Sequence, residues 1–529
     1  MDARPPSPTP PGYRAFLVVT ALVCGAMVMM VEVLGSRVIG PFFGVSLFVW
    51  TALIAVALLA LAAGYAAGGV LADRRGAPDL LYGIILVAGL LVAAIPVFKT
   101  PVLRACGVFG LRSGALASAT LLFGPSLFCL GCVSPFLARL ATRDLKTLGR
   151  TVGLLYALST AGSFAGTVLA GFVLIERFGV DATLAALGAV LVALALAWFL
   201  LFRRRWAVLV CTLPLLVLVA LFPPARGTVS KILPGGVRAT RTVNRDTFYG
   251  NLKVIDYEAG TSRTRALLID GQIQGGVDLA DGRSPYAYAY FLQYLPPALA
   301  PGGTTCLVIG LGAGVVPRWY EEQGVRTDVV DINPAVVDLA RSHFGYGAAG
   351  RVFVSDARSF LRESAERYDY MILDVFNGDT TPSHLMSLEA FRLMRERLSP
   401  GGALAINLIG TVAGRGAFAT ASVIRTLGEV FPDVRMYPGF GRGATEGNIT
   451  VVAGGSLGPL DPSRLPLTQI HPRAIDGVLP YLRGGFRFPE GTPAIVLSDD
   501  FNPLDVLELS LKEQERLAVL RNADWDLIL

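Results

Sequence analysis

The sequence predicts an α-helical membrane bundle of about seven spans followed by an α/β region. Three observations support this. Residues 15–223 hold long apolar stretches with few acidic groups. From about residue 229, short alternating apolar runs are typical of β-hairpins. After Pro301, strands and helices alternate in the βαβ pattern of a doubly wound sheet. The chain of 529 residues is 16% charged, below the roughly 25% of an ordinary soluble domain.

The expected membrane domain covers residues 15–223. A spanning helix needs about 20 apolar residues, and residues 1–14 are proline-rich and polar, so we expect them to be disordered. The first apolar stretch lacks a small-residue cleavage site and is followed by further spans, so it is predicted to be an anchor and not a signal peptide. The seven stretches are residues 15–36, 45–71, 80–98, 114–140, 151–174, 180–202 and 206–223.

Two charged residues stand in or beside the first span. A carboxylate in lipid is costly unless it is paired or hydrated. Glu32 is therefore either a substrate or proton site facing the bundle interior or part of an ion pair that locks two helices, and Arg37 lies near the end of the same span. The stretch GGVLADRRG after the second span resembles the loop motif of major-facilitator transporters, which keeps a transport function open.

Two opposing arguments leave open on which side of the membrane the α/β region lies. The N-terminus and the loops after spans two, four and six carry 11 Lys and Arg residues when Arg139 at the end of span four is included, whereas the other loops carry 5. This bias predicts a cytoplasmic N-terminus, and seven spans would then place the α/β region outside. Nucleotide-type ligands are made inside cells, which argues for the cytoplasm. We expect a multi-pass protein of the cell membrane with the bilayer as partner.

The sequence carries no signal for metal or nucleic acid. The three histidines are scattered, and Cys129 and Cys132 lie within an apolar helix without a second cysteine pair. Close helix packing through small residues explains that spacing better than metal or redox chemistry. The Arg residues sit mainly in short loops between spans, which suits lipid headgroups. We therefore predict neither a metal site nor a nucleic-acid partner.

The α/β region divides into three expected parts. Residues 229–298 form a small β-rich part, residues 299–455 a Rossmann-like part, and residues 456–529 a C-terminal extension. Within the second part, helices are expected at 315–323, 334–344, 358–365 and 388–397, and a late strand at 448–454. Ligands of such sheets bind at the carboxyl ends of the strands.

A glycine turn opens the Rossmann-like part. The apolar run LVIG leads into Gly310, Gly312 and Gly314, which permit a tight turn and close approach of a ligand to the backbone. A dinucleotide pattern would need glycine at Val315. The G-x-G-x-G spacing is commoner in folds that bind S-adenosyl-methionine.

Three aspartates follow at successive strand ends. Asp331 is placed to accept hydrogen bonds from ribose hydroxyls, and Asp356, followed by Ala357, from an adenine amino group. Asp374 ends the next strand. One such acid is ordinary in a solvated turn, whereas three in order predict an adenosyl ligand.

Residues 245–410 resemble the spermidine synthases, the polyamine aminopropyltransferases. The resemblance rests on YGNLKV, LLIDGQIQ, YLPPAL, the glycine turn, SDARSFL and YDYMILDVF followed by PSHL. LSDDFNPLD near the C-terminus is similar to the form in multi-spanning members of the family. The resemblance implies a transferase of polyamine biosynthesis, with Asp374 as the base that deprotonates an incoming amine. It also implies that Gln274 lies at the gate near the reacting groups, that Tyr288 lies in the substrate site, and that a homodimer is possible.

Several positions depart from the family pattern. The family has an acid in the glycine turn, where this chain has Ala313, and a second acid at the position of Asn377. Further family acids are replaced by Ser284, Pro285 and Tyr290. Because these acids bind a diamine dication, we expect a non-standard acceptor, either a small-molecule amine or a lipid-soluble one. Without an acid at Ala313, intact S-adenosyl-methionine is a plausible donor beside its decarboxylated form.

Replacement acids for the acceptor pocket are proposed at Asp379, Asp499 and Asp500, which otherwise would cap a helix or end a strand. Three functions remain open at this point. The first is an aminopropyltransferase-like enzyme, which also includes transfer of an aminocarboxypropyl group. The second is an S-adenosyl-methionine-dependent methyltransferase on the same fold, and the third is a transporter whose α/β region senses an adenosyl ligand.

Overall fold

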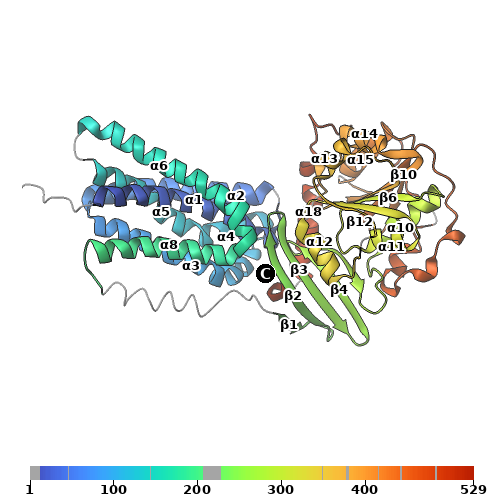
Figure 1. Cartoon of the computed structure of the whole chain (residues 1–529), viewed down its shortest axis with the longest axis horizontal. Helices are drawn as coiled ribbons and strands as arrows, with labels where there is room; N and C mark the ends of the chain where they lie inside the picture. Colours follow the sequence, from blue (N-terminus) through green and yellow to red (C-terminus); the bar gives the residue numbers. More distant parts are fainter. Residues whose placement is uncertain are drawn as a thin grey trace, which may run out of the picture. The chain divides into compact units, whose positions relative to one another are not determined.

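The computed structural model describes residues 12–45, 47–142, 145–206, 228–347, 349–376, 381–414, 416–440, 444–482, 485–522 and 524–528. The chain separates into two compact units. A helical unit comprises the residues up to Gly227 together with the short segment Arg245–Gly250. An α/β unit comprises Thr228–Asn244 and Asn251–Ile528 (Figure 1).

The helical unit contains six helices that are long and apolar enough to cross a membrane, counted over the described residues. The expected seventh span, 206–223, lies outside the described residues apart from Trp206. The six spans are formed from the α-helical segments α1 (Tyr13–Phe43), α2 (Leu47–Arg74), α3 (Pro78–Gly107), α5 (Gly124–Ala141), α6 (Leu148–Leu169) with α7 (Ile175–Phe178), and α8 (Val180–Leu201). A further segment, α4 (Leu111–Leu122), is too short to be a span by itself. A π-helical turn, Ala170–Leu174, joins α6 to α7, so that these form one span.

The expected fourth span, 114–140, is not one uninterrupted helix. It is divided into α4 and α5 at Phe123, and only α5 qualifies by itself as a span. The division has a local cause, since Gly124 and Pro125 follow at once. Proline lacks the backbone N–H that would continue the helix but is well suited to a first turn.

Glycines set the packing of three helix pairs in this unit, α1 with α6, α2 with α5 and α3 with α8. A Cβ added at Gly162 of α6 would lie 2.1 Å from the Leu22 carbonyl oxygen of α1. At Gly64 of α2 it would lie 2.3 Å from the Phe128 carbonyl oxygen of α5. These approaches leave no room for a side chain, as in membrane helices joined through small residues.

Ion pairs and hydrogen bonds hold the helical unit together. Lys99 of α3 lies 2.6 Å from Asp181 of α8, and Asp79 at the start of α3 accepts hydrogen bonds from Trp198 and Arg203. Arg37 of α1 donates to the backbone carbonyl of Phe248, which belongs to the same unit. These contacts join residues that are far apart in the sequence.

The α/β unit begins with an antiparallel five-stranded sheet in sequence order. This confirms the hairpins predicted from the alternating pattern. The strands are β1 (Val229–Ile232), β2 (Arg238–Thr247), β3 (Gly250–Ala259), β4 (Ser262–Ile269) and β5 (Gln272–Asp278).

A seven-stranded sheet follows, in the order β11-β12-β10-β9-β6-β7-β8. The five strands from β10 to β8 are parallel, and β12 runs antiparallel to both β10 and β11. Its strands are β6 (Thr305–Ile309), β7 (Arg326–Asp331), β8 (Val352–Val354), β9 (Tyr368–Leu373), β10 (Leu398–Thr411), β11 (Asp433–Pro438) and β12 (Glu446–Gly454).

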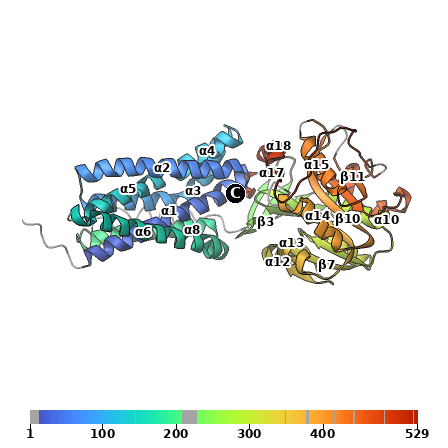
Figure 2. The same ribbon diagram turned by 90° about the horizontal axis from the view of Figure 1, so that it is seen from above.

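Helices cover both faces of this sheet (Figure 2). Leu307 and Ile309 of β6 contribute to one hydrophobic core, and Cys306 and Val308 to another. This two-sided burial explains why the strand is apolar throughout. The core around Val308 holds side chains of α10 (Ala287–Leu299), α11 (Val315–Glu322) and α12 (Pro334–His343), and the core around Leu307 those of α13 (Ala357–Glu363), α14 (Leu388–Glu396) and α15 (Ala417–Gly428).

The C-terminal segment belongs to the α/β unit. It contains α16 (Ile475–Val478), α17 (Leu504–Leu507), α18 (Leu509–Asn522) and α19 (Trp525–Ile528). Arg516 of α18 is 1% exposed and donates to the Asp270 carbonyl oxygen in the turn between β4 and β5, at 2.9 Å. Leu527 of α19 packs with Leu268 in the small sheet. The segment is therefore fixed against the five-stranded sheet.

Candidate active site

The order of the strands creates the crevice that holds the candidate site. From β6 the chain continues to β7 and β8 on one side, whereas β9 pairs with the other side of β6. Ligands of doubly wound sheets bind at such a switch point. Gly310 directly follows β6 and Asp374 directly follows β9. Both lie at this crevice.

Gly310 allows the ends of β6 and β9 to approach each other. Its φ is +93°, and an added Cβ would lie 2.1 Å from the Asp374 carbonyl oxygen. Only glycine combines this backbone conformation with this space. The amide of Asp374 in turn donates to the Ile309 carbonyl oxygen at 2.9 Å.

The other glycines of the turn contact different parts of the unit. Gly312 has φ +52°, and a Cβ there would lie 3.4 Å from the Gln274 carbonyl oxygen. Gly314 has φ +74°, and a Cβ there would lie 2.9 Å from the nearest side-chain atoms of Tyr346. The glycine turn therefore touches the loop after α12 as well as β5 of the small sheet.

Asp331 at the end of β7 holds the glycine turn in place. Its carboxylate accepts hydrogen bonds from the amides of Leu311 (2.9 Å) and Asn333 (2.8 Å). Burial raises the pKa of Asp331, and these two bonds oppose the rise. Each carboxylate oxygen can accept more than one hydrogen bond, so Asp331 can also receive a ligand hydroxyl.

Asp356 follows β8 and forms the N-cap of α13, where it accepts from the Ser359 amide at 2.9 Å. Its other carboxylate oxygen lies 3.9 Å from His384. Ala357 begins α13 and is 8% exposed. Across the sheet, Asp374 at the end of β9 and Asp331 at the end of β7 therefore lie on opposite sides of β6, and Asp356 follows β8 beyond β7.

The Asp374 side chain is partly buried at the wall of the crevice and accepts a hydrogen bond from a neighbouring side chain. The Asn407 side-chain amide of β10 donates to its Oδ1 at 2.9 Å. Burial raises the pKa of Asp374 to about 6, and the bond from Asn407 opposes this rise. A carboxylate with that pKa is ionised at neutral pH and can still take up a proton readily.

Tyr288 and Gln274 lie beside this carboxylate. The Tyr288 hydroxyl donates to the Gln274 carbonyl oxygen at 3.1 Å. Burial raises the pKa of Tyr288 well above its usual value, and the nearby charge of Asp374 adds to the rise. Tyr288 therefore stays protonated and can act as a hydrogen-bond donor.

These three residues line a cavity of about 560 Å³. Its wall is formed by the small sheet, the start of α10, the ends of β9, β10 and β12, and the C-terminal helices. The lining residues are Leu233, Tyr257, Leu268, Gly271, Gln272, Ile273, Gln274, Pro285, Tyr286, Ala287, Tyr288, Asp374, Phe376, Asn407, Ile409, Gly439, Asn448, Glu515, Val519, Asp524, Leu527 and Ile528.

Not every residue that was predicted for the pocket of the acceptor substrate lines this cavity. Asp499 pairs with Arg358 at 2.8 Å and accepts from the Ser387 hydroxyl at 2.6 Å. The hydrogen bonds from Arg358 lower the pKa of Asp499 to about 2, whereas burial acts in the opposite direction. Neither Asp499 nor Asp500 is among the described residues that line the cavity. Asn377 and Asp379 lie outside the described residues.

The sequence reasoning missed several polar residues of the cavity, namely Gln272, Asn407, Asn448, Glu515 and Asp524. Asn407 carries a local signal, since it is a polar residue in the apolar strand ALAINLIG. Glu515 carries none, because α18 is rich in charged residues and only its packing shows which of them face the site.

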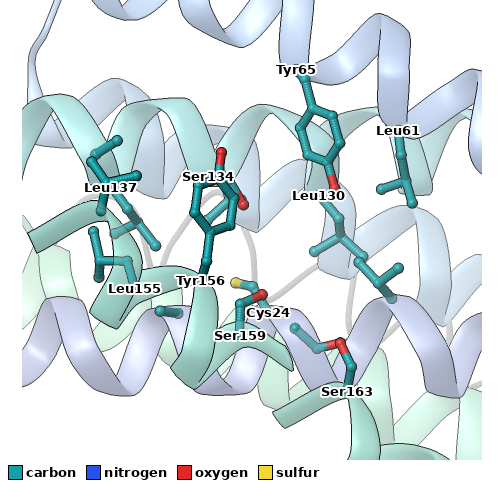
Figure 3. Close-up of a pocket in the computed structure, with 16 residues that line it drawn as sticks. Cys24, Leu61, Tyr65, Leu130, Ser134, Leu137, Leu155, Tyr156, Ser159 and Ser163 are labelled. Atoms are coloured by element: carbon teal, nitrogen blue, oxygen red, sulfur yellow. The ribbon is translucent and has the colours of Figure 1, made fainter. Parts of the chain in front are cut away.

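The helical unit has a separate, much smaller cavity of about 80 Å³ (Figure 3). Its hydroxyl groups come from Tyr65, Ser134, Tyr156, Ser159 and Ser163, among apolar residues of α1, α2, α5 and α6. A cavity of this size with several polar groups suits a few water molecules. Glu32, which is partly buried on α1, is not among the described residues that line it.

Across the described residues, no group of three or more His, Cys, Asp or Glu side chains is arranged to hold a metal ion.

Comparison with known proteins gives relatives of two kinds, while no family model matches. Polyamine aminopropyltransferase of Mycobacterium tuberculosis strain H37Rv is 26% identical over 415 residues, covering 70% of this chain and 78% of that protein. Polyamine aminopropyltransferase 1 of Streptomyces coelicolor is 26% identical over 433 residues, covering 76% and 77%. The chain is a homologue of the polyamine aminopropyltransferases.

Shorter matches are also found. N-terminal histidine N-methyltransferase of Emericella nidulans is 33% identical over 143 residues, covering 26% of this chain and 25% of that protein. The chain spans between a quarter and a half of the length of this relative, of a probable polyamine aminopropyl transferase of Bifidobacterium longum and of the polyamine aminopropyltransferase of Vibrio vulnificus. A probable spermidine synthase of Corynebacterium glutamicum, known from its crystal structure, has a TM-score of 0.34 and 22% identity over 40% of this chain and 80% of that one.

Proposed function

We propose that this multi-pass membrane protein transfers an aminopropyl or related group from an S-adenosyl-methionine-type donor to an amine. The observation that carries the proposal is the position of Asp374. Its carboxylate, with a pKa of about 6, lines the 560 Å³ cavity directly beside the glycine turn. The homology to aminopropyltransferases over 70–76% of the chain supports the same conclusion.

In the proposed reaction, Asp374 takes a proton from the acceptor amine. The nitrogen lone pair then attacks the carbon bound to the donor sulfonium, so that a C–N bond forms and a C–S bond breaks. The bonding electrons return to sulfur, which leaves as a neutral thioether. Asn407 holds the carboxylate in position, and the Tyr288 hydroxyl is placed to orient one of the reactants.

The donor would bind at the ends of β6 to β8. The glycine turn offers backbone close to the ligand, Asp331 would accept from the ribose hydroxyls, and Asp356 with Ala357 would contact the adenine. Decarboxylated S-adenosyl-methionine is the donor that homology to aminopropyltransferases favours. Ala313, buried in the turn, presents no carboxylate to repel that of intact S-adenosyl-methionine.

Methyl transfer is therefore a second candidate function. Two observations favour it, namely Ala313 and the 33% identity to an N-methyltransferase over 143 residues. Both reactions need an adenosyl sulfonium and a nucleophilic amine, so the same residues serve either one. They differ in which carbon of the donor is attacked.

The by-product separates the two functions. The full-length protein in detergent or lipid discs would be incubated with either donor and a panel of amines, and the nucleoside released would be identified by mass spectrometry. Methylthioadenosine is expected and shows that a propyl-type group has moved, and S-adenosyl-homocysteine would show methyl transfer. Neither product, despite tight donor binding, would refute both functions and favour a transporter with a sensory α/β unit.

We also propose that the α/β unit faces the cytoplasm. The donor carries this proposal, because a site for an S-adenosyl-methionine-type ligand needs access to the compartment in which that ligand is made. The number of spans does not carry it, since six are counted over the described residues and the expected seventh, 206–223, lies outside them apart from Trp206. Protease added to inverted membrane vesicles should cleave the α/β unit, and protection there with cleavage in right-side-out vesicles would contradict this topology.

A further inference from the structure

The cavity offers a position for one amino group, at Asp374 and Asn407. The Asn407 side-chain amide donates to the Asp374 carboxylate at 2.9 Å, and its Oδ1 is buried with no hydrogen-bond partner among the described residues. A buried acceptor of this kind is costly unless a ligand satisfies it. An amine bound here can donate one N–H to the Asp374 carboxylate and another to the Asn407 oxygen.

Uncharged surface begins directly beside this position. Ile409 follows Asn407 by two residues on β10, so both side chains project from the same face of the sheet, and both line the cavity. At the glycine turn, an ideal Cβ on Gly275 would lie 3.1 Å from the Tyr288 hydroxyl oxygen and 3.5 Å from the Ala313 Cβ. The carbon chain of a bound amine would therefore leave the amino group past neutral side chains.

The five-stranded sheet and the C-terminal segment add a hydrophobic cluster to the wall. Leu268 of β4 and Leu527 of α19 are buried within this cluster, and Leu233 and Tyr257 pack against it. All four line the cavity, as does Val519 of α18. Burying a ligand methylene against such a wall strengthens binding by up to about fourfold. The wall therefore favours a ligand with an extended apolar body.

The carboxylates of the wall other than Asp374 already interact with other residues. Among the described lining residues these are Glu515 and Asp524. Asp524 forms an ion pair with Lys231 at 2.7 Å, and Glu515 also has a partner within the chain. A second ammonium group would have to displace one of these partners or lose its hydration against apolar side chains, and both are unfavourable. The cavity therefore disfavours a second cation.

We propose that the acceptor is a monoamine with an extended apolar body, selected by an apolar wall that includes Ile409 and Val519. This inference rests on the proposed transferase function and names its substrate class. The amino group binds at Asp374 and Asn407, and the carbon chain passes Ile409 and fills the apolar part of the cavity.

The first experiment measures the selectivity of the unaltered full-length protein. Alkylamines from propylamine to octylamine and the diamines of equal chain length would be assayed by release of the nucleoside by-product. We expect kcat/KM for the monoamines to rise by up to about fourfold per added methylene until the cavity is full. At octyl length the monoamine should exceed the diamine by at least about tenfold, because the second ammonium loses its hydration.

Val519→Asp tests the wall itself. A carboxylate at this position should lower kcat/KM for octylamine and raise it for 1,8-diaminooctane, so that their ratio falls by about tenfold, as for a charge-assisted contact. The gain with the diamine would also show that the variant is folded.

Val506→Asp of α17 is the matched control. It makes the same change in the same C-terminal segment, at a side chain that is 64% exposed and is not among the described lining residues. The preference for the monoamine should persist in this variant.

The outcomes separate this inference from the proposed function. No turnover of any amine with either donor would refute the transferase itself. Turnover without a preference for monoamines, or without a rise with chain length, would refute the apolar monoamine alone. An unchanged ratio in Val519→Asp, or an equal change in Val506→Asp, would refute the role of Val519. If Val519→Asp is inactive, the amine series with the unaltered protein still decides the substrate class.

Discussion

The two halves of the candidate site are built in different ways. The donor half consists of a glycine turn and two aspartates, which lie at or just after the ends of β6, β7 and β8. The acceptor half combines side chains from both sheets, α10 and the C-terminal helices. Local backbone geometry thus determines the donor half, whereas long-range packing determines the acceptor half. This difference suggests that a common donor chemistry can be paired with a changed acceptor.

Asp374, the proposed base, lies between the two halves, and its substitution should give the largest effect. Asp374→Asn removes proton acceptance, and loss of a general base typically costs roughly 10²–10⁴-fold in rate. We therefore expect turnover to fall by about 10³-fold. Release of the nucleoside by-product under single-turnover conditions measures this, with donor binding as the control.

The same substitution should stabilise the protein at high pH. The folded-state pKa of about 6 lies above the usual 3.8, so ionisation of Asp374 costs stability as the pH rises through this range. Asp374→Asn should therefore raise the free energy of unfolding by at most about 3 kcal/mol at pH 8, by less at about pH 5 and by nothing below about pH 3.8. Thermal unfolding at the three pH values tests the trend, and a destabilised Asp374→Asn protein at pH 8 would contradict it.

The glycine turn provides the sharpest test of the donor half. Gly310→Ala introduces a Cβ only 2.1 Å from the Asp374 carbonyl oxygen, so the ends of β6 and β9 must move apart. Donor affinity, measured by calorimetry, should fall by at least about tenfold, since a small displacement of binding groups is enough for such a loss.

Gly302→Ala is a matched control for that substitution. Gly302 has φ +90°, close to the +93° of Gly310, but a Cβ there meets nothing within 4 Å. It should therefore cost only the backbone strain of about 1–2 kcal/mol and leave donor affinity unchanged. Similar losses of affinity in both variants would show that strain, and not the contact with Asp374, matters.

The hydrogen bond from Asn407 should be visible in the pH dependence. For the unaltered protein, kcat/KM should rise with pH through about 6, because Asp374 must be ionised to accept a proton. Asn407→Ala removes a hydrogen bond to the charged carboxylate and should move this midpoint upward by about one pH unit. An unchanged midpoint would mean that a different group controls the profile.

The smallest effect is expected at Asp499, outside the cavity. Its pKa of about 2 means that its ion pair with Arg358 stabilises the fold above pH 3.8 and that this contribution is lost as the pH falls through 2. Because the Asp499 side chain is 39% exposed, Asp499→Asn should cost only about 1 kcal/mol at pH 7. A large loss of activity with normal thermal stability would instead place Asp499 in the acceptor site.

Much of this architecture could be predicted because the determining features are local. Runs of apolar residues indicated the membrane helices, the period-two pattern the β-hairpins, and the alternation of strands with helices the doubly wound sheet. Helices expected at 315–323 and 334–344 are found at Val315–Glu322 and Pro334–His343. The break at Phe123 was missed, although Gly124 and Pro125 were visible, because the surrounding residues are uniformly apolar.

Within the site, the order of residues along the chain was enough to predict the glycine turn and the succession of Asp331, Asp356 and Asp374. Each directly follows a strand or sits in a turn, so its place depends on a few neighbouring residues. The folded chain was needed to show that Asn407 holds Asp374, that Asp499 pairs with Arg358, and that Glu515 lines the cavity.

Glu515 shows why the acceptor half could not be predicted. It is far from Asp374 in the chain, and no periodicity within α18 indicates which of its charged residues faces the cavity. That choice depends on the packing of α18 against the small sheet, where buried Arg516 fixes the helix.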